Sequence, residues 1–281
     1  MGNAEKAACA ETVRAAVRLI KRAGRAFACD DTTASHAKIK CDTVANAGLL
    51  AREVDLILVF GGDGTMLHAA RQVAGSGTPI LGVNIGSLGF LTAVPSDQMG
   101  DALKQIWAGE YHYESRALIE ASGVFNGKRL VAPALNDIVI SRGAVSRLIA
   151  LDVSVNHELV TRYRCDGLIV SSPTGSTAYS LAAGGAIVLP TADVFALTPI
   201  CPHALSNRSI ILPLSATIRV KAINTYPAAF LNADGQIVGE LAAGDALTIR
   251  RSRHSVRLLR LANGSFLEAM RRKLHWRGTY L

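Results

Sequence analysis

The stretch VDLILVFGGDGT, residues 54–65, decides the fold of this 281-residue chain. Its apolar part is short, nearly continuous and ends in two glycines, which is typical of a buried parallel strand. The following residues, MLHAARQVA (66–74), have the pattern of a helix. In an open α/β sheet, ligands bind beyond the carboxyl ends of the strands. A glycine-rich turn before a helix presents main-chain N–H groups, which suits phosphate.

Asp63 places a carboxylate at this anion-binding turn. Two functions fit a carboxylate there. It holds a magnesium ion that accompanies the phosphates, or it accepts the proton of a hydroxyl that attacks them. An ordinary turn aspartate is the third interpretation, and the pentapeptide GGDGT alone leaves all three open.

The residues around this stretch predict a βαβ arrangement. A helix is expected within residues 4–24, and TPILGV (78–83) is a second short apolar run. The segment NIGSLGFL (84–91) then supplies two more glycines, Gly86 and Gly89. Two adjacent strands that both end in glycine turns would form one cleft.

From about residue 111 onward, the apolar residues alternate instead of following a helical period. Examples are the runs 149–155, 218–222 and 247–249. Alternation with glycine-containing turns predicts antiparallel strands. We therefore expect an α/β domain over 1–110 and a mostly antiparallel, β-sandwich-like domain over 111–262. The helical stretch within 263–281 is expected to pack back on the first domain.

One loop in the second half has a composition that suits a nucleotide. It lies in CDGLIVSSPTGSTAYSLAAGG (165–185), where a buried strand leads into a Ser/Thr/Gly-rich turn and a short helix with Ser or Thr at its capping position. Hydroxyls and main-chain amides suit a sugar or phosphate, and Tyr179 offers a ring to a base. Loops of this composition are also ordinary helix caps.

Composition excludes several classes of protein. The net charge of +8 suits anionic ligands, but its Lys and Arg residues are scattered and aromatic residues make up only 5%, which argues against nucleic-acid binding. Five cysteines without a CxxC spacing argue against disulfides and zinc sites. No apolar run has membrane-spanning length and no signal peptide opens the chain, so a cytoplasmic protein without a membrane partner is expected.

Six segments together resemble the NAD kinase family. They are GGDGT (61–65), NIGSLGFL (84–91), ALNDIVI (134–140), DGLIVSSPTGSTAYSLAAGG (166–185), PICPHALSNRSIILP (199–213) and DGQ (234–236). GGDGT is shared with lipid kinases and phosphofructokinases, whereas PTGSTAYS and PHALSNR are more specific. The resemblance implies the NAD kinase/diacylglycerol kinase-like fold, with an α/β domain and a β-sandwich-like domain. It also implies transfer of the γ-phosphoryl group of ATP to the 2′-hydroxyl of the adenosine ribose of NAD, giving NADP and ADP.

The resemblance further implies which residues form the site. Asp63 would be the proton acceptor, and the other residues would bind the substrates. These are Gly64, Asn136, Asp137, Arg147, Arg164, Asp166, Thr177, Ala178, Tyr179, Ser180, Leu181, Ala182 and Gln236. His68 lies where some relatives carry a basic contact, although a solvent-facing helical histidine is the simpler interpretation. The family also implies Mg²⁺ with ATP, NAD as substrate, and a homodimer or homotetramer.

Two departures from the family pattern are visible. Asp137 replaces the usual glutamate and is one methylene shorter. Only Met1-Gly2-Asn3 precedes the first predicted helix, where relatives usually open with a strand. A misassigned or truncated start is one interpretation, and a missing strand would leave a sheet edge unpaired. A lipid or sphingoid-base kinase and a non-catalytic NADP-binding protein remain rival interpretations. The choices between ATP and polyphosphate, and between NAD and NADH, stay open.

Overall fold

The computed structural model describes residues 1–86, 89–125, 127–143, 147–225, 228–262 and 265–276, and divides into two compact units. The first unit comprises Met1–Ser115 and Ser255–Leu281, and the second comprises Arg116–His254. Two long strands, β6 (Tyr111–Phe125) and β17 (Ala246–Leu261), continue from one unit into the other. Ser87 and Leu88 of the NIGSLGFL segment lie outside the described residues.

The first unit is an α/β unit built around the strand that the sequence predicts. That strand, β3 (Ile57–Gly61), pairs in parallel with β4 (Ile80–Asn84), which confirms two adjacent strands at the glycine turns. β4 in turn pairs in parallel with β5 (Val94–Pro95) and with β17. The remaining elements are α1 (Ala7–Arg22), β1 (Cys29–Asp30), α2 (Asp31–Ala37), β2 (Thr43–Val44), α3 (Ala47–Leu50), α4 (Asp63–Val73), a 3₁₀ turn (Ser96–Gln98), α5 (Met99–Ala108) and α7 (Phe266–Lys273).

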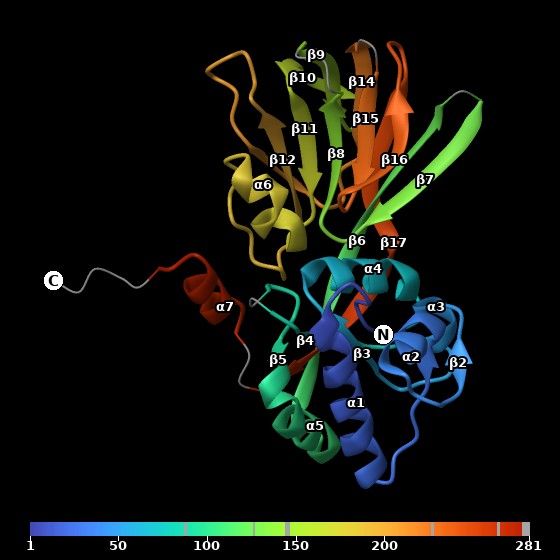
Figure 1. The fold of residues 1–281 in the computed structure, drawn as a ribbon. Coiled ribbons are helices and arrows are strands. Elements are labelled where there is room, and N and C mark those ends of the chain that lie inside the picture. The colour runs from blue at the N-terminus through green and yellow to red at the C-terminus, as the bar shows by residue number, and fades with distance from the viewer. Residues whose placement is uncertain (87–88, 126, 144–146, 226–227, 263–264, 277–281) are drawn as a thin grey trace, which may run out of the picture. The chain divides into compact units, whose positions relative to one another are not determined.

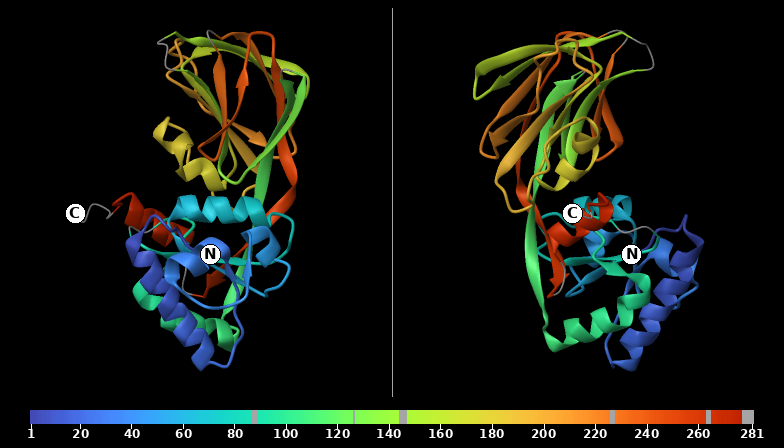
Figure 2. Two further views of the ribbon diagram at one scale, coloured as in Figure 1. Left: turned by 45° about the vertical axis from the view of Figure 1, so that its right-hand side comes forward. Right: turned by 90° about the vertical axis from the view of Figure 1, so that its left-hand side faces the viewer.

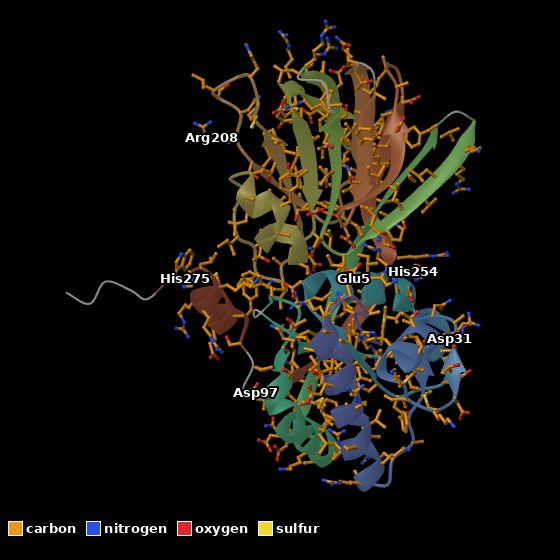
Figure 3. All side chains as sticks on the ribbon, viewed as in Figure 1. Glu5, Asp31, Asp97, Arg208, His254 and His275 are labelled. Atoms are coloured by element: carbon orange, nitrogen blue, oxygen red, sulfur yellow. The ribbon has the colours of Figure 1, made fainter. Side chains whose placement is uncertain are left out.

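Helices α1 and α5 lie side by side in the first unit (Figure 1). Val13 of α1 and Leu103 of α5 belong to one buried cluster with Phe60 of β3 and Val83 of β4. This packing follows from the apolar face of α1, whose residues recur at helical spacing. Asp31 and Asp97 lie on the outside of the same unit (Figure 3).

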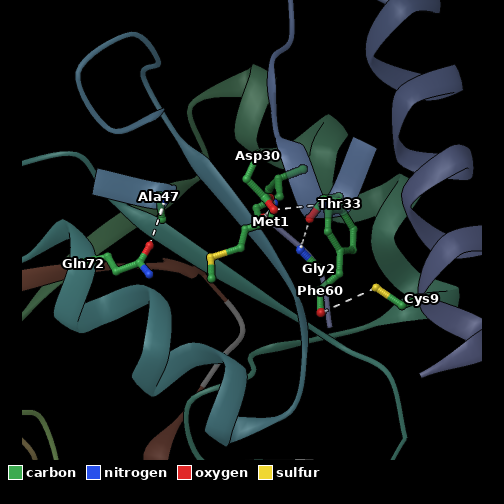
Figure 4. A network of polar contacts seen from close by, with 9 residues as sticks. Met1, Gly2, Cys9, Asp30, Thr33, Ala47, Phe60 and Gln72 are labelled. Atoms are coloured by element: carbon green, nitrogen blue, oxygen red, sulfur yellow. Dashed lines mark hydrogen bonds and ion pairs between the residues drawn. The ribbon is translucent and has the colours of Figure 1, made fainter. Parts of the chain in front are cut away.

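The first three residues pair with β3, contrary to the unpaired edge that the sequence suggested. The Met1 amine donates to the Leu58 carbonyl at 2.9 Å, Phe60 N–H donates to the Met1 carbonyl at 2.8 Å, and Asn3 N–H donates to the Phe60 carbonyl at 2.9 Å. Gly2 N–H donates to Thr33 Oγ1 at 2.6 Å, as Figure 4 shows. Three residues therefore satisfy main-chain groups of β3 that would otherwise lack a partner.

The second unit is a two-layer β structure, as predicted. One layer has the order β10-β9-β14-β17, and the other has the order β13-β12-β11-β8-β15-β16, with antiparallel pairing throughout. Figure 2 shows the two layers from two further sides. The remaining bounds are β7 (Lys128–Ala134), β8 (Asp137–Arg142), β9 (Ile149–Val155), β10 (Glu158–Cys165), β11 (Gly167–Ser171), β12 (Val194–Ile200), β13 (Ile210–Pro213), β14 (Ile218–Asn224), β15 (Ala229–Ala233), β16 (Gln236–Leu241), a 3₁₀ turn (Thr174–Thr177) and α6 (Tyr179–Ala182).

The core of the second unit lies between the two layers. Leu151, Val220 and Ile249 face it from one sheet, and Ile140 and Val170 face it from the other. These residues occupy alternate positions on their strands, which is the pattern that predicted the β domain. All five cysteines of the chain are free thiols. Within the described ranges, no helix has the length and apolar character needed to cross a membrane.

Candidate active site

Asp63 is the first residue of helix α4, so the helix begins three residues earlier than the sequence predicted. Gly62 precedes it in an extended conformation at the N-cap position. A carboxylate in the first turn of a helix interacts favourably with the helix dipole and with unpaired main-chain N–H groups nearby. The glycine turn and the helix therefore join without an intervening loop, and the carboxylate of Asp63 is fixed to a rigid element.

The segment that follows β4 surrounds this carboxylate with donors. Phe90 N–H donates to Asp63 Oδ2 at 2.8 Å. Oδ1 accepts from Leu91 N–H at 3.1 Å, from Thr92 N–H at 3.3 Å and from Thr92 Oγ1 at 3.4 Å. Gly89 allows this approach, because a Cβ at that position would lie 1.8 Å from Asp63 Oδ1. The two glycine turns, which follow β3 and β4, therefore contact each other through the Asp63 carboxylate.

Lys6 brings a cation to the same two turns. Its Nζ donates to the Ile85 carbonyl at 2.7 Å. The same Nζ lies 3.9 Å from the place of a Cβ on Gly62 and 3.4 Å from that of a Cβ on Gly86. An ammonium beside glycine main chain can neutralise a phosphate that the N–H groups also contact. No sequence pattern singles out Lys6 beyond its charge.

Two other predicted residues of this unit are exposed on α4. Gly64 has open space around it. The His68 ring is held by its own helix, because the Gln72 amide donates to His68 Nε2 at 2.8 Å. Gln72 Oε1 in turn accepts from Ala47 N–H at 2.9 Å (Figure 4). His68 therefore has the solvent-facing position that was its simpler interpretation.

In the second unit, Asn136 and Asp137 stand at the start of β8 and are anchored by Asp234. The Asp234 carboxylate accepts from Leu135 N–H at 2.9 Å, from Asn136 N–H at 2.7 Å and from Asp137 N–H at 3.3 Å. Burial, together with the charge of Asp234, raises the pKa of the Asp137 carboxyl to about 7. Asp137 is thus a buried acid that changes its charge near neutral pH.

The Ser/Thr/Gly-rich loop is fastened to Asn136 through the main chain. Ser172 N–H donates to the Asn136 carbonyl at 2.8 Å, and the Ser172 hydroxyl donates to the Leu135 carbonyl. Gly175 lies against the same residue, since a Cβ on Gly175 would be 2.1 Å from the Asn136 carbonyl oxygen. The loop and the Asn136-Asp137 pair therefore form one continuous surface.

Replacing Gly175 with alanine is expected to push this loop off Asn136. The added Cβ would meet main-chain atoms, which cannot move aside as a flexible side chain does. We expect the free energy of unfolding to fall by about 1–3 kcal/mol, measured by urea denaturation. Gly100→Ala is the matched control, because a Cβ there meets only Leu19 Cδ1 at 3.9 Å. Equal stability of the two variants would contradict the close approach.

The helix after this loop differs from the prediction in its cap. Its N-cap is Ala178, without a side-chain cap, so the expected Ser or Thr cap is wrong. The hydroxyls of the region are used internally: Ser180 Oγ and Thr198 Oγ1 are 3.1 Å apart and buried. Tyr179 has an exposed ring. The remaining predicted residues of this turn and helix are Thr177, Ala178, Leu181 and Ala182, of which Ala182 is exposed and the others are half-buried.

The other predicted residues of the second unit are spread along its strands. Asp166 forms an ion pair with Arg142, with Nε 2.6 Å from Oδ1. Arg164 lies on β10 with an exposed side chain, and Gln236 is exposed next to the Asp234-Gly235 turn. Arg147 is exposed just before β9. Among the described residues, the main chain at Asn136 and the 171–177 loop are in direct contact.

Sequence reasoning missed the residues that hold the candidate site in place. Asp234 enters the sequence analysis only as part of the segment DGQ, whereas it anchors the main chain of Asn136 and Asp137. Thr92 was not singled out, although it is buried and donates twice to Asp63. An aspartate followed by glycine is common in hairpins, so the pattern alone could not reveal the anchoring role.

Both halves of the chain match known family profiles. Residues 4–111 match the profile described as ATP-NAD kinase N-terminal domain, and residues 135–261 match ATP-NAD kinase C-terminal domain. A protein named NAD kinase from Thiobacillus denitrificans is 41% identical over 267 residues, which cover 94% of this chain and 91% of that protein. Another, from Koribacter versatilis, is 42% identical and covers 83% of this chain and 82% of that protein.

Two solved structures have a similar fold. A yeast NADH kinase complexed with NADH has a TM-score of 0.85 at 26% identity, covering 96% of this chain and 85% of that one. An NAD kinase from Archaeoglobus fulgidus in complex with ATP has a TM-score of 0.73 at 25% identity, covering 95% of each chain.

Proposed function

Because this chain belongs to the ATP-NAD kinase family, we propose that it transfers the γ-phosphoryl group of ATP to the 2′-hydroxyl of the adenosine ribose of NAD, giving NADP and ADP. The observation that carries this proposal is the Asp63 carboxylate, fixed at the start of α4 beyond the carboxyl end of β3. A carboxylate at this place serves a reaction in which a hydroxyl is the nucleophile.

Asp63 Oδ2 is the atom that we assign as proton acceptor. Oδ1 already accepts three hydrogen bonds from described residues, whereas Oδ2 accepts one, from Phe90 N–H. An ionised carboxylate has about four acceptor positions, so Oδ2 has capacity for the ribose hydroxyl. As the proton moves to Oδ2, the ribose oxygen bonds to the γ-phosphorus. The bond from that phosphorus to the bridging oxygen breaks, and ADP leaves with the electron pair.

For NAD, we propose a binding surface built on the second unit. Asn136 offers an amide, and Asp137 offers an acceptor, to ribose hydroxyls or adenine. Because Asp137 is shorter than the family's glutamate, its oxygen reaches the ligand only through a small shift or a water molecule. Tyr179 offers an exposed ring. The other residues assigned to this surface are Arg147, Arg164, Asp166, Thr177, Ala178, Ser180, Leu181, Ala182 and Gln236.

Magnesium is proposed to enter with ATP. Among the described residues, no group of three or more His, Cys, Asp or Glu side chains could hold a metal ion. Mg²⁺ commonly binds through phosphates, waters and one or two carboxylates, which is consistent with this composition of the site. When bound, it neutralises charge on the phosphates of ATP.

Lys6 is proposed to contact the phosphates of ATP beside the glycine turns. We expect Lys6→Met to raise the KM for ATP by about tenfold, equivalent to about 1.4 kcal/mol, because one charge-assisted contact is lost. The KM for NAD should change by less than twofold. Lys104→Met is the control, since Lys104 is exposed and pairs only with Asp101 among the contacts described here. An unchanged KM for ATP in Lys6→Met would exclude the contact.

ATP is proposed as the donor and NAD as the acceptor. The related Archaeoglobus fulgidus structure contains ATP and the yeast relative contains NADH, so NADH and inorganic polyphosphate belong in the same assays. Equal rates with polyphosphate would overturn the choice of donor.

We also propose that the chain forms a homodimer or homotetramer in the cytoplasm. Light scattering would test the oligomeric state, and cell fractionation would test the location.

The deciding experiment is NADP formation by the purified protein with NAD, ATP and magnesium, read through an NADP-specific dehydrogenase. We expect turnover. Two rival functions give different results in the same experiment. A lipid or sphingoid-base kinase would phosphorylate an apolar alcohol and not NAD. A non-catalytic NADP-binding protein would show a thermal shift with NADP but no turnover with any donor.

A further inference from the structure

The segment Phe90–Thr92, which holds Asp63, is itself held from its other side by Arg260. Its N–H groups point to the Asp63 carboxylate. Two of its carbonyls accept from the Arg260 guanidinium: Leu91 from Nη1 and Phe90 from Nη2, each at 3.4 Å. Opposite faces of the same short segment therefore contact an anion and a cation.

Arg260 is in turn fixed by Glu114. Its Nε donates to Glu114 Oε2 at 3.0 Å. The Arg260 side chain is only 12% exposed and that of Glu114 is 28% exposed. A planar guanidinium can donate to a carboxylate and to two carbonyls from a rigid fork of N–H groups, whereas the donors of an ammonium all radiate from one nitrogen. Glu114 lies on β6 and Arg260 on β17, so both partners come from the ends of long strands.

These contacts form one chain of polar groups, from Glu114 through Arg260 and the 90–92 segment to Asp63. Hydrogen bonds in such a chain polarise one another, and each fixes the orientation of the next group. The Arg260 guanidinium polarises the peptide groups whose carbonyls it contacts, which strengthens the N–H groups of the 90–92 segment as donors to Asp63. The Asp63 carboxylate is thus linked, through the 90–92 segment, to a pair of side chains that do not touch it.

We propose that Arg260 and Glu114 are positioning residues that orient Asp63 for proton acceptance in phosphoryl transfer. This role depends on the proposed kinase activity of the same site. Catalysis is sensitive to displacements of about 1 Å in a reacting group, so a looser segment lowers kcat even though substrate contacts are unchanged. The pair acts on the chemical step and not on substrate affinity.

The first test is the kinetics of Arg260→Lys and Glu114→Gln. Each is expected to lower kcat about tenfold, because the bridge between the two carbonyls and the carboxylate is lost, with KM for NAD and ATP changed by less than twofold. Arg250→Lys is the matched control, since Arg250 donates from Nε and Nη2 to Glu120 at 3.1 and 2.9 Å in the second unit, with a side chain 59% exposed. A higher KM with unchanged kcat would overturn the positioning role.

The second test separates positioning of Asp63 from a general structural effect. If Arg260 acts through Asp63, Arg260→Lys will lower kcat by less than twofold when Asp63 is already asparagine. A further tenfold loss in that background would show independent action and would overturn the proposal.

The third test does not require activity. Hydrogen exchange of the Phe90, Leu91 and Thr92 amides should be at least severalfold faster in Arg260→Lys than in the unsubstituted chain, and unchanged in Arg250→Lys. Unchanged exchange in Arg260→Lys would overturn the proposal that Arg260 holds the 90–92 segment in place. Absence of turnover in the unsubstituted chain would instead reject the proposed function, so the two failures are distinguishable.

Discussion

Asp63→Asn is expected to lower kcat by roughly 100- to 10,000-fold, the usual contribution of a general base. The amide cannot take the proton from the ribose hydroxyl, so the nucleophile must attack without that assistance. NAD should still bind, because the surface proposed for it is built on the second unit. The measurement is NADP formation under saturating NAD and ATP, with NAD binding followed by calorimetry.

The asparagine also disturbs the segment that holds residue 63. One carboxylate oxygen becomes an NH₂ group, which then faces either the Phe90 N–H or the N–H groups of Leu91 and Thr92. Two donors that face each other cannot form a hydrogen bond. We therefore expect faster amide exchange at residues 90–92 in this variant. Asp97→Asn serves as the control, because Asp97 lies on the outside of the first unit (Figure 3). Full turnover by Asp63→Asn would exclude Asp63 as the base.

Local pattern was sufficient to predict the parts of the fold that depend on neighbours in sequence. The strand before GGDGT was found, although β3 begins at Ile57 and not at Val54. The alternation of Leu151 and Val153, both fully buried, predicted strands of a β layer. These predictions are correct because burial of alternate residues and a glycine turn each require particular residue types at particular spacings.

The residues that orient the candidate site could not be predicted in this way. Asp234 contacts Asn136 across 98 positions, and Arg260 contacts Phe90 across 170. Each is one polar residue on a strand end or in a turn, where solvent exposure is the usual outcome. Only the pairing of the strands brings such residues to their partners. The start of α4 was also misplaced, because the role of Asp63 as the first helical residue depends on the extended conformation of Gly62.

The second large effect is expected for Asp137→Asn, on stability. The pKa of Asp137 is about 7 in the folded chain, against 3.8 for the ordinary value. Between these two values, the folded state binds more protons than the unfolded state, so the free energy of unfolding falls as pH rises. A difference of about three pKa units corresponds to about 4 kcal/mol in the free energy of unfolding. The chain loses this contribution in full above pH 7 and keeps it in full below pH 4.

Asparagine removes the charge but keeps the shape of the side chain. Asp137→Asn should therefore be more stable than the unsubstituted chain at pH 8, by up to about 4 kcal/mol less the cost of any amide hydrogen left unpaired, and nearly equal to it at pH 4. Urea denaturation followed by far-ultraviolet circular dichroism at both pH values measures this. Asp193→Asn is the control, as an exposed carboxylate of the same unit. A stability difference that does not change with pH would contradict the raised pKa.

The same substitution separates stability from binding. If Asp137 accepts a hydrogen bond from NAD, its ionised form is the stronger acceptor, so the KM for NAD should fall as pH rises through 7. The asparagine variant should have a higher KM at pH 8 that varies less with pH. A chain that becomes more stable and binds NAD less well would show that the buried carboxylate is kept for the ligand and not for the fold, because stabilising changes at binding sites commonly reduce function. Greater stability with an unchanged KM would instead remove Asp137 from the NAD surface.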